Sequence, residues 1–362
     1  QRIASSEQFQ MIVTYLFGAE AAPTFLQQFR QIKTIDAFQC NIILDFLVRL
    51  RKSTTGGVRL SDFTKLRYRS NLFITNHRDI VLDSAFLNMC LCEDGVRTSE
   101  IAIGDNLLIY PWIADLVRLN KSFIVKRSGT PRELLQNSIR MSAYIRHDIT
   151  ERQESVWIAQ REGRCKDSND RTQESLLKML ALSGEGSMAK RLKELHMVPI
   201  SISYEYDPCD YLKAKEFQLK RDNPNYKKTP ADDLLSMKTG VMGQKGRVHF
   251  YVCEYMDDFF DELDKKTTDK AEQCSAIAQE IDRRIHAGYE LFPGHWVALD
   301  WLKGTQQFTH CYTQEEKEQF EAYIKQQLDK IDLPNKDEEF LLDKLLSMYA
   351  NPVINYLNAK KG

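Results

Sequence analysis

Apolar residues recur at helical spacing near both ends of this chain, whereas short β-rich runs occupy its middle. The helical period appears in residues 7–52, as at Phe9, Ile12 and Val13, and again in residues 269–289. Between them, β-rich runs alternate with helical segments, a pattern typical of an α/β sheet whose functional loops follow the strand ends. The predicted strands are residues 71–75, 101–103, 123–125, 155–159, 198–204 and 248–252.

These zones predict three parts: an N-terminal helical module at residues 1–56, an α/β domain at 57–260 and a C-terminal helical region at 261–362. The expected architecture is a mixed sheet flanked by helices. Residues 220–232, which are polar and contain two prolines, are predicted as a long loop. The glycines of residues 238–246 either cradle a phosphate or form the turn before the last strand, and we favour the turn.

Composition excludes several functional classes. The 50 basic and 51 acidic residues nearly cancel, so a nucleic-acid-binding protein is not expected. The eight cysteines are scattered without metal-ligand spacing, which suggests reduced thiols in a cytoplasmic protein. No run reaches the roughly 18 apolar residues that span a bilayer, and the N-terminus lacks the pattern of a signal peptide.

A histidine follows the first predicted strand, and a carboxylate begins the apolar stretch after it. A strand-to-helix turn of this kind exposes His77 while Asp83 returns toward its ring, which is how a general base is oriented. The alternative is an ordinary turn and helix cap. The tripeptide His77-Arg78-Asp79 resembles a protein-kinase catalytic loop. That loop needs Asn five residues after its Asp, and position 84 is Ser, so a kinase is excluded. A serine hydrolase is an alternative that ranks lower, because no Gly-x-Ser-x-Gly elbow is present.

Three further segments follow predicted strands. In the second, Gly104 permits a tight turn, and basic residues that include Arg127 lie at the far end. In the third, Gly163 stands beside Arg164 and Lys166, an arrangement of backbone amides and cations that suits a phosphate monoester; Cys165 is expected to be a small neighbouring side chain. The fourth, at residues 197–205, is by itself a core strand.

The order of these segments resembles the glycerolipid acyltransferases, the superfamily of glycerol-3-phosphate and lysophosphatidate acyltransferases. The resemblance covers residues 58–255. The matching positions are Asn76, His77 and Arg78, then Gly104, Asn106, Leu107, Pro111, Phe123 and Arg127, then Glu162, Gly163 and Arg164, then Val198, Pro199, Tyr204 and Glu205.

The chain departs from the family pattern at two places. Five residues separate His77 from Asp83 where the family has four, so Asp79, at the family's Ser position, rivals Asp83 as the acid. The third segment lacks one residue between Gly163 and Arg164. The altered His-to-Asp spacing also favours an alternative, a catalytically weak lipid-binding protein on the same fold.

The resemblance implies an O-acyltransferase of phospholipid synthesis, in which His77 and Asp83 or Asp79 are catalytic. It implies acyl-CoA or acyl carrier protein as co-substrate, no further cofactor and no metal. The acceptor is glycerol-3-phosphate, 1-acylglycerol-3-phosphate or another lyso-lipid, such as an amino-acid lipid. A cytoplasmic protein peripheral on the membrane surface is expected. The implied substrate-binding residues are Arg78, Arg127, Glu162, Gly163, Arg164 and Lys166.

Overall fold

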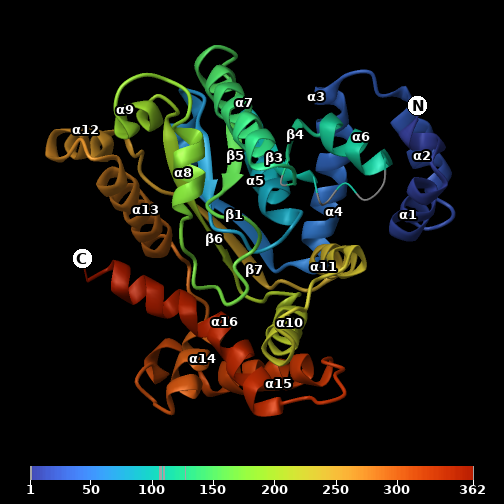
Figure 1. The fold of residues 1–362 in the computed structure, drawn as a ribbon. Coiled ribbons are helices and arrows are strands. Elements are labelled where there is room, and N and C mark those ends of the chain that lie inside the picture. The colour runs from blue at the N-terminus through green and yellow to red at the C-terminus, as the bar shows by residue number, and fades with distance from the viewer. Residues whose placement is uncertain (1, 106–107, 109–110, 127, 362) are drawn as a thin grey trace.

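A computed structural model of the protein describes residues 2–105, 108, 111–126 and 128–361, and its strands form one sheet (Figure 1). The strand order is β1-β7-β6-β2-β5-β3-β4. Strands β6 and β7 pair antiparallel, and the other neighbours pair parallel. This mixed sheet with flanking helices confirms the predicted fold class. The strands are β1 (Gly57–Ser61), β2 (Leu72–Thr75), β3 (Glu100–Gly104), β4 (Ser122–Val125), β5 (Val156–Ala159), β6 (Met197–Tyr204) and β7 (Arg247–Val252).

Helices cover both faces of the sheet and extend the chain at both ends. They are α1 (Glu7–Phe17), α2 (Ala22–Gln31), α3 (Ile35–Phe38), α4 (Leu44–Thr54), α5 (Leu82–Glu93), α6 (Pro111–Leu119), α7 (Pro131–Thr150), α8 (Glu174–Leu180), α9 (Met188–Lys193), α10 (Asp210–Asp222), α11 (Pro230–Met242), α12 (Asp257–Lys266), α13 (Lys270–Ala287), α14 (Pro293–Lys303), α15 (Gln314–Asp329) and α16 (Glu338–Ala359). A π-helical turn, Gln39–Ile43, joins α3 to α4. Among the described residues, no helix has the length and apolar content needed to cross a membrane.

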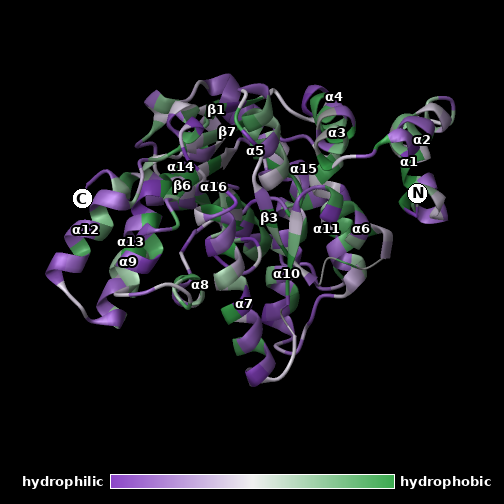
Figure 2. Ribbon diagram, turned by 90° about the horizontal axis from the view of Figure 1, so that it is seen from above, coloured by the Kyte–Doolittle hydropathy of each residue, from purple (hydrophilic) through white to green (hydrophobic). Residues whose placement is uncertain are grey.

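The two-residue period of the strands divides the core between the faces of the sheet. Leu72 and Ile74 of β2 face a cluster that includes residues of α8, α9 and α13, whereas Phe73 faces one that includes α4 and α5. Strand β5 divides in the same way, with Trp157 on the side of Phe73. Figure 2 shows hydrophobic and hydrophilic residues alternating along outer helices such as α7. The sheet is therefore buried on both faces, as expected of largely parallel sheets.

The chain ends form two smaller cores. Helices α1 to α3 share an aromatic cluster with α6, and α14, α15 and α16 share another with α10. In Figure 1 the helices α10, α14, α15 and α16 lie together below the sheet. The helix predicted at residues 269–289 is α13, which begins after the cap residue Asp269. The domain boundaries stay a prediction.

Three expectations about segments differ from the structure. Strand β1 was missed because Val58 and Leu60 give too short an alternation, and its pairing with β7 depends on residues far along the chain. The loop predicted at 220–232 is confined to residues 223–229, since α10 continues to Asp222 and α11 begins at Pro230 with a capping box. The turn predicted at 238–246 is likewise shorter, because α11 extends to Met242.

The parallel register brings three motif segments to one edge of the sheet. Strands β2, β5 and β6 are neighbours that run in the same direction. Their carboxyl ends therefore meet, and so do the motif residues that follow them. These residues start at Asn76, Gln160 and Glu205.

Candidate active site

His77 and Asp83 are hydrogen-bonded at the carboxyl end of β2. The Nδ1 atom of His77 lies 2.8 Å from Oδ2 of Asp83. The Asp83 side chain is 1% exposed and that of His77 is 13% exposed. Among the described residues, Nε2 of His77 has no hydrogen-bond partner. The pair therefore has the geometry of an oriented base, with Nδ1 held by the carboxylate and Nε2 left for a substrate.

The same oxygen of Asp83 also shapes the loop around the histidine. It accepts hydrogen bonds from the backbone N–H of Arg78 at 2.6 Å and of Asp79 at 3.1 Å. The preceding residue, Asn76, exchanges two hydrogen bonds with the backbone of Ile202 on β6. One carboxylate oxygen thus fixes both the ring and the peptide groups next to it.

Asp79 has a different task. Its Oδ1 accepts from the backbone N–H groups of Val81 and Leu82, both at 2.8 Å, and so caps the first turn of α5. Burial and the charge of Asp83 raise the pKa of Asp79. The structure therefore pairs His77 with Asp83, and the fifth intervening residue fits into the turn before α5. The unusual spacing does not separate the two side chains.

Arg78 points into the protein. Its guanidinium forms an ion pair with Asp170 at 2.7 Å, and the two side chains are 7% and 0% exposed. Tyr289 donates a hydrogen bond to the same carboxylate at 2.5 Å, and the Arg78 guanidinium lies over the Tyr289 ring. This geometry makes Arg78 an internal anchor of the loop.

Gly163 and Arg164 follow β5 close to the histidine loop. Gly163 has φ +68°, in the left-handed region that favours glycine. The backbone N–H of Cys165 donates to the carbonyl of His77 at 3.3 Å. The Nη1 atom of Arg164 is buried without a hydrogen-bond partner among the described residues, and its positive charge helps to lower the pKa of Asp207. Arg164 is therefore a partly buried cation beside the His77–Asp83 pair.

Lys166 turns from this loop toward α10. Its ammonium forms an ion pair with Glu216, which also binds Lys220 at 2.9 Å and Lys228 at 3.2 Å. Burial lowers the pKa of Lys166 to about 8, although Glu216 opposes the shift. Burial alone would raise the pKa of Glu216, but the surrounding lysines lower it to about 2.

Two other residues of this segment are placed by the structure. Glu162 is exposed, and its backbone N–H donates to the Gln173 side chain. Burial and the charge of Asp170 raise the pKa of the Cys165 thiol to about 12, in keeping with its expected passive role. Arg127, Asn106 and Leu107 lie outside the described residues.

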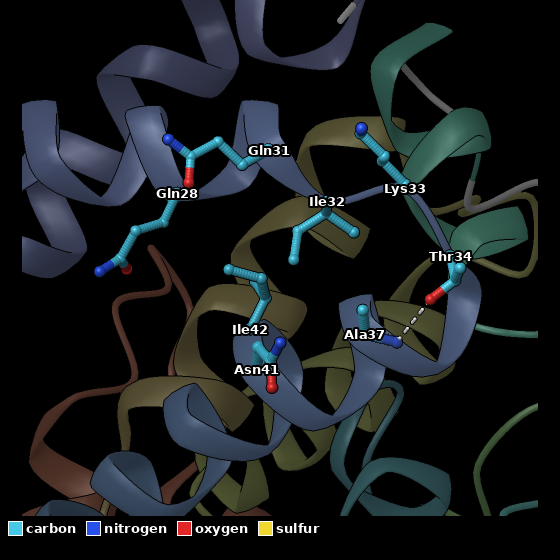
Figure 3. A pocket seen from close by; sticks show the side chains of 8 residues that line it. All are labelled: Gln28, Gln31, Ile32, Lys33, Thr34, Ala37, Asn41 and Ile42. Atoms are coloured by element: carbon cyan, nitrogen blue, oxygen red, sulfur yellow. Dashed lines mark hydrogen bonds between the residues drawn. The ribbon is translucent and has the colours of Figure 1, made fainter.

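Neither of two cavities found among the described residues is lined by His77 or Asp83. A cavity of about 550 Å³ lies among the N-terminal helices (Figure 3), and none of the residues that line it is a predicted site residue. A second, of about 20 Å³, adjoins Arg78, Tyr289 and Tyr349. No group of three His, Cys, Asp or Glu side chains in the described parts of the chain could hold a metal ion.

Several residues around the loop carried no signal in the sequence. Asp170, Tyr289 and Lys213 hold Arg78 by its side chain or its backbone. Tyr289 is 211 positions from Arg78, so no local pattern connects them. From the sequence alone, a lysine such as Lys213 is expected on the solvated surface, and only the tertiary structure shows that it is buried.

Comparison with known proteins identifies a family over part of this chain. Residues 58–203 match the family described as Acyltransferase, and all four motif segments lie within this range or at its edge. Residues 58–203 therefore form an acyltransferase domain, and the protein is an acyltransferase. One solved structure that it resembles is the 1-acyl-sn-glycerophosphate (LPA) acyltransferase PlsC from Thermotoga maritima. That protein is 11% identical, with a TM-score of 0.42, and the match covers 76% of this chain and 94% of that chain. No curated protein matches the sequence.

Proposed function

We propose that this acyltransferase moves a fatty acyl group from a thioester, acyl-CoA or acyl carrier protein, to a hydroxyl of glycerol-3-phosphate or 1-acylglycerol-3-phosphate. The observation that carries the proposal is the His77–Asp83 hydrogen bond, with Nε2 left for a substrate, in a loop contacted by the segment of Arg164. The reaction needs a base for the acceptor hydroxyl and a cation for its phosphate. The candidate site offers both.

His77 acts as general base and then as general acid. Its Nε2 takes the hydroxyl proton as the acceptor oxygen attacks the thioester carbonyl, and the resulting imidazolium is stabilised by Asp83. When the tetrahedral intermediate collapses, the carbon–sulfur bond breaks and the imidazolium returns the proton to the thiolate. The products are the ester and the free thiol, and the proposed steps involve no metal and no further cofactor.

Arg164 binds the acceptor phosphate in this proposal. Its buried Nη1 has no hydrogen-bond partner among the described residues, and such a donor is costly unless a ligand satisfies it. Lys166, already paired with Glu216, contributes charge to the same region rather than a direct bond. The backbone at Gly163 shapes the turn between them, whereas Arg78 contributes through the loop because its side chain is paired inside the protein.

Arg164→Gln and Lys166→Met separate these two roles. Losing a charge-assisted bond of about 1.5–3 kcal/mol raises the acceptor KM about 10- to 100-fold in Arg164→Gln, with the thioester KM unchanged. Lys166→Met gives a smaller rise. Equal rises in both KM values for Arg164→Gln would contradict the assignment.

The protein meets its lipid substrates at the cytoplasmic face of a membrane without spanning it. On α1, Met11 is 71% and Tyr15 is 63% exposed, and Ile12 is also exposed. Exposed apolar and aromatic side chains on one helix suit shallow insertion between lipid head groups. Flotation with liposomes tests this: Met11→Glu combined with Tyr15→Glu reduces the bound fraction, and unchanged binding would refute a role for α1.

The deciding experiment is thiol release from a long-chain acyl-CoA. Purified protein is offered glycerol-3-phosphate or 1-acylglycerol-3-phosphate, with His77→Ala as the control. Acceptor-dependent release that His77→Ala abolishes supports the proposal and selects the acceptor. If neither acceptor causes thiol release, also when acyl carrier protein is the donor, the result would point to another lyso-lipid as the acceptor.

A further inference from the structure

The backbone next to the candidate base is held by a lysine outside the matched acyltransferase region. Lys213 on α10 is 2% exposed. Its Nζ donates to the carbonyl oxygen of Arg78 at 3.2 Å and forms an ion pair with Asp207. Burying an ammonium is costly unless acceptors surround it. One of the two acceptors is the carbonyl oxygen of the residue that follows His77.

This bond completes the fixation of the histidine loop. The N–H of Arg78 donates to Asp83, its carbonyl accepts from Lys213, and its guanidinium binds Asp170. The peptide N–H of Arg78 is therefore bound by a carboxylate, and its carbonyl is bound by an ammonium. Because a displacement of about 1 Å can reduce a rate about 100-fold, the rigidity of this loop bears directly on the position of Nε2.

Lys213 is in turn connected to the C-terminal helices. Its partner Asp207 donates from the backbone N–H to the hydroxyl of Tyr349 at 3.1 Å. Tyr349 on α16 and Tyr323 on α15 each donate to Asp210 at 2.7 Å. The helices α10, α15 and α16 lie side by side in Figure 1.

A small cavity lies along the same route. Its volume of about 20 Å³, between Arg78 and Tyr349, gives room for one water molecule. A polar path thus leads from α16 to the loop.

We infer that Lys213 is a positioning residue for His77, and that Tyr349 and the C-terminal helices anchor it. The inference rests on the proposed function, since it concerns the placement of the same base. A purely structural ion pair would affect only the stability of the fold. A positioning residue affects kcat in molecules that are fully folded, while KM changes little because the substrate contacts remain.

The test compares Lys213→Met, which keeps the chain length but loses the ammonium, with Lys213→Arg, which keeps the charge and donors. Lys215→Met on the same helix is the matched control. We expect kcat to fall about 100-fold in Lys213→Met with both KM values within about threefold, and Lys213→Arg to regain at least tenfold. Tyr349→Phe, which removes one hydroxyl, lowers kcat about tenfold. All variants are assayed below their unfolding temperatures.

Each outcome decides the matter. A folded Lys213→Met with kcat within threefold of wild type, or with a raised KM and an unchanged kcat, overturns the inference. If Lys213→Met does not fold, the decision passes to Tyr349→Phe, where an unchanged kcat overturns the inference and the expected fall supports it. His77→Ala separates the two hypotheses: normal activity in that variant refutes the proposed function, whereas loss of activity there with a normal Lys213→Met refutes only the positioning role.

Discussion

Replacing Asp83 with Asn removes the charge behind His77 and little else. The amide oxygen of Asn can occupy the site of Oδ2 and still accept from His77 Nδ1 and from the backbone N–H groups of Arg78 and Asp79. Its amide nitrogen replaces Oδ1, which has no hydrogen-bond partner among the described residues. The loop geometry should therefore survive, so the change tests electrostatics rather than folding.

The expected loss follows from the distance. With Nδ1 and Oδ2 2.8 Å apart, the charge centres of imidazolium and carboxylate are about 4 Å apart, where two unit charges attract by about 4 kcal/mol at an effective dielectric constant of about 20. Since each ~1.36 kcal/mol is tenfold in rate, kcat should fall about 10³-fold in Asp83→Asn. The assay is thiol release at saturating donor and acceptor.

Asp79→Asn is the matched control. Asn caps a helix as well as Asp, so the bonds to Val81 and Leu82 persist and kcat should stay within about threefold of wild type. A fall in kcat of less than tenfold in Asp83→Asn would refute the assignment of Asp83 as the partner of His77. So would a fall in kcat in Asp79→Asn as large as that in Asp83→Asn.

Three further predictions concern stability and reactivity. A Cβ at Gly240 would overlap the carboxylate of Asp79, so Gly240→Ala should lower the free energy of unfolding in urea by about 1–3 kcal/mol; a gain, as helix propensity alone predicts, would contradict the packing. Burial and the charge of Asp207 raise the pKa of Asp210 to about 7. Between about pH 4 and 7 the folded state therefore retains a proton that the unfolded state releases. The free energy of unfolding of the wild type should decrease as pH rises through this window. Asp210→Asn should therefore gain stability relative to wild type across that window, by up to about 1.4 kcal/mol per pH unit, and parallel urea-unfolding profiles would contradict this. Because the pKa of Cys165 is raised to about 12, iodoacetamide at pH 7.5 should leave this thiol unmodified in a peptide map of the folded protein, and Cys165→Ala should keep kcat within about threefold.

Local sequence was sufficient for much of the site. His77 and Asp83 are six positions apart, and a strand end followed by a helix start brings such residues together without help from the rest of the chain. The strands that precede Asn76, Gln160 and Glu205 were predictable from their apolar runs, and parallel pairing then places their ends at one edge. The acyltransferase class followed from the resemblance of these segments to a known family.

The tertiary structure decided which of the cations near the base are already paired. Arg78, Arg164 and Lys166 are alike in sequence as candidates for a phosphate. In the fold, Arg78 forms an ion pair with Asp170 and Lys166 one with Glu216, although Nη1 of Arg78, like Nη1 of Arg164, is buried without a hydrogen-bond partner in the described part of the chain. Arg164 differs in that it forms no ion pair among the described residues. The partners come from distant segments, and the cost of burying a charge makes such pairs specific.

The sequence by itself therefore determined the fold class and the chemistry of the base, because both arise from local periodicity and from contacts within one turn. It could not determine how the loop of His77 is held. That depends on Lys213, Asp170 and Tyr289, whose contacts with Arg78 span up to 211 positions. Such contacts exist only after the sheet and the C-terminal helices have packed, because packing is what removes water from these polar groups and leaves them to one another.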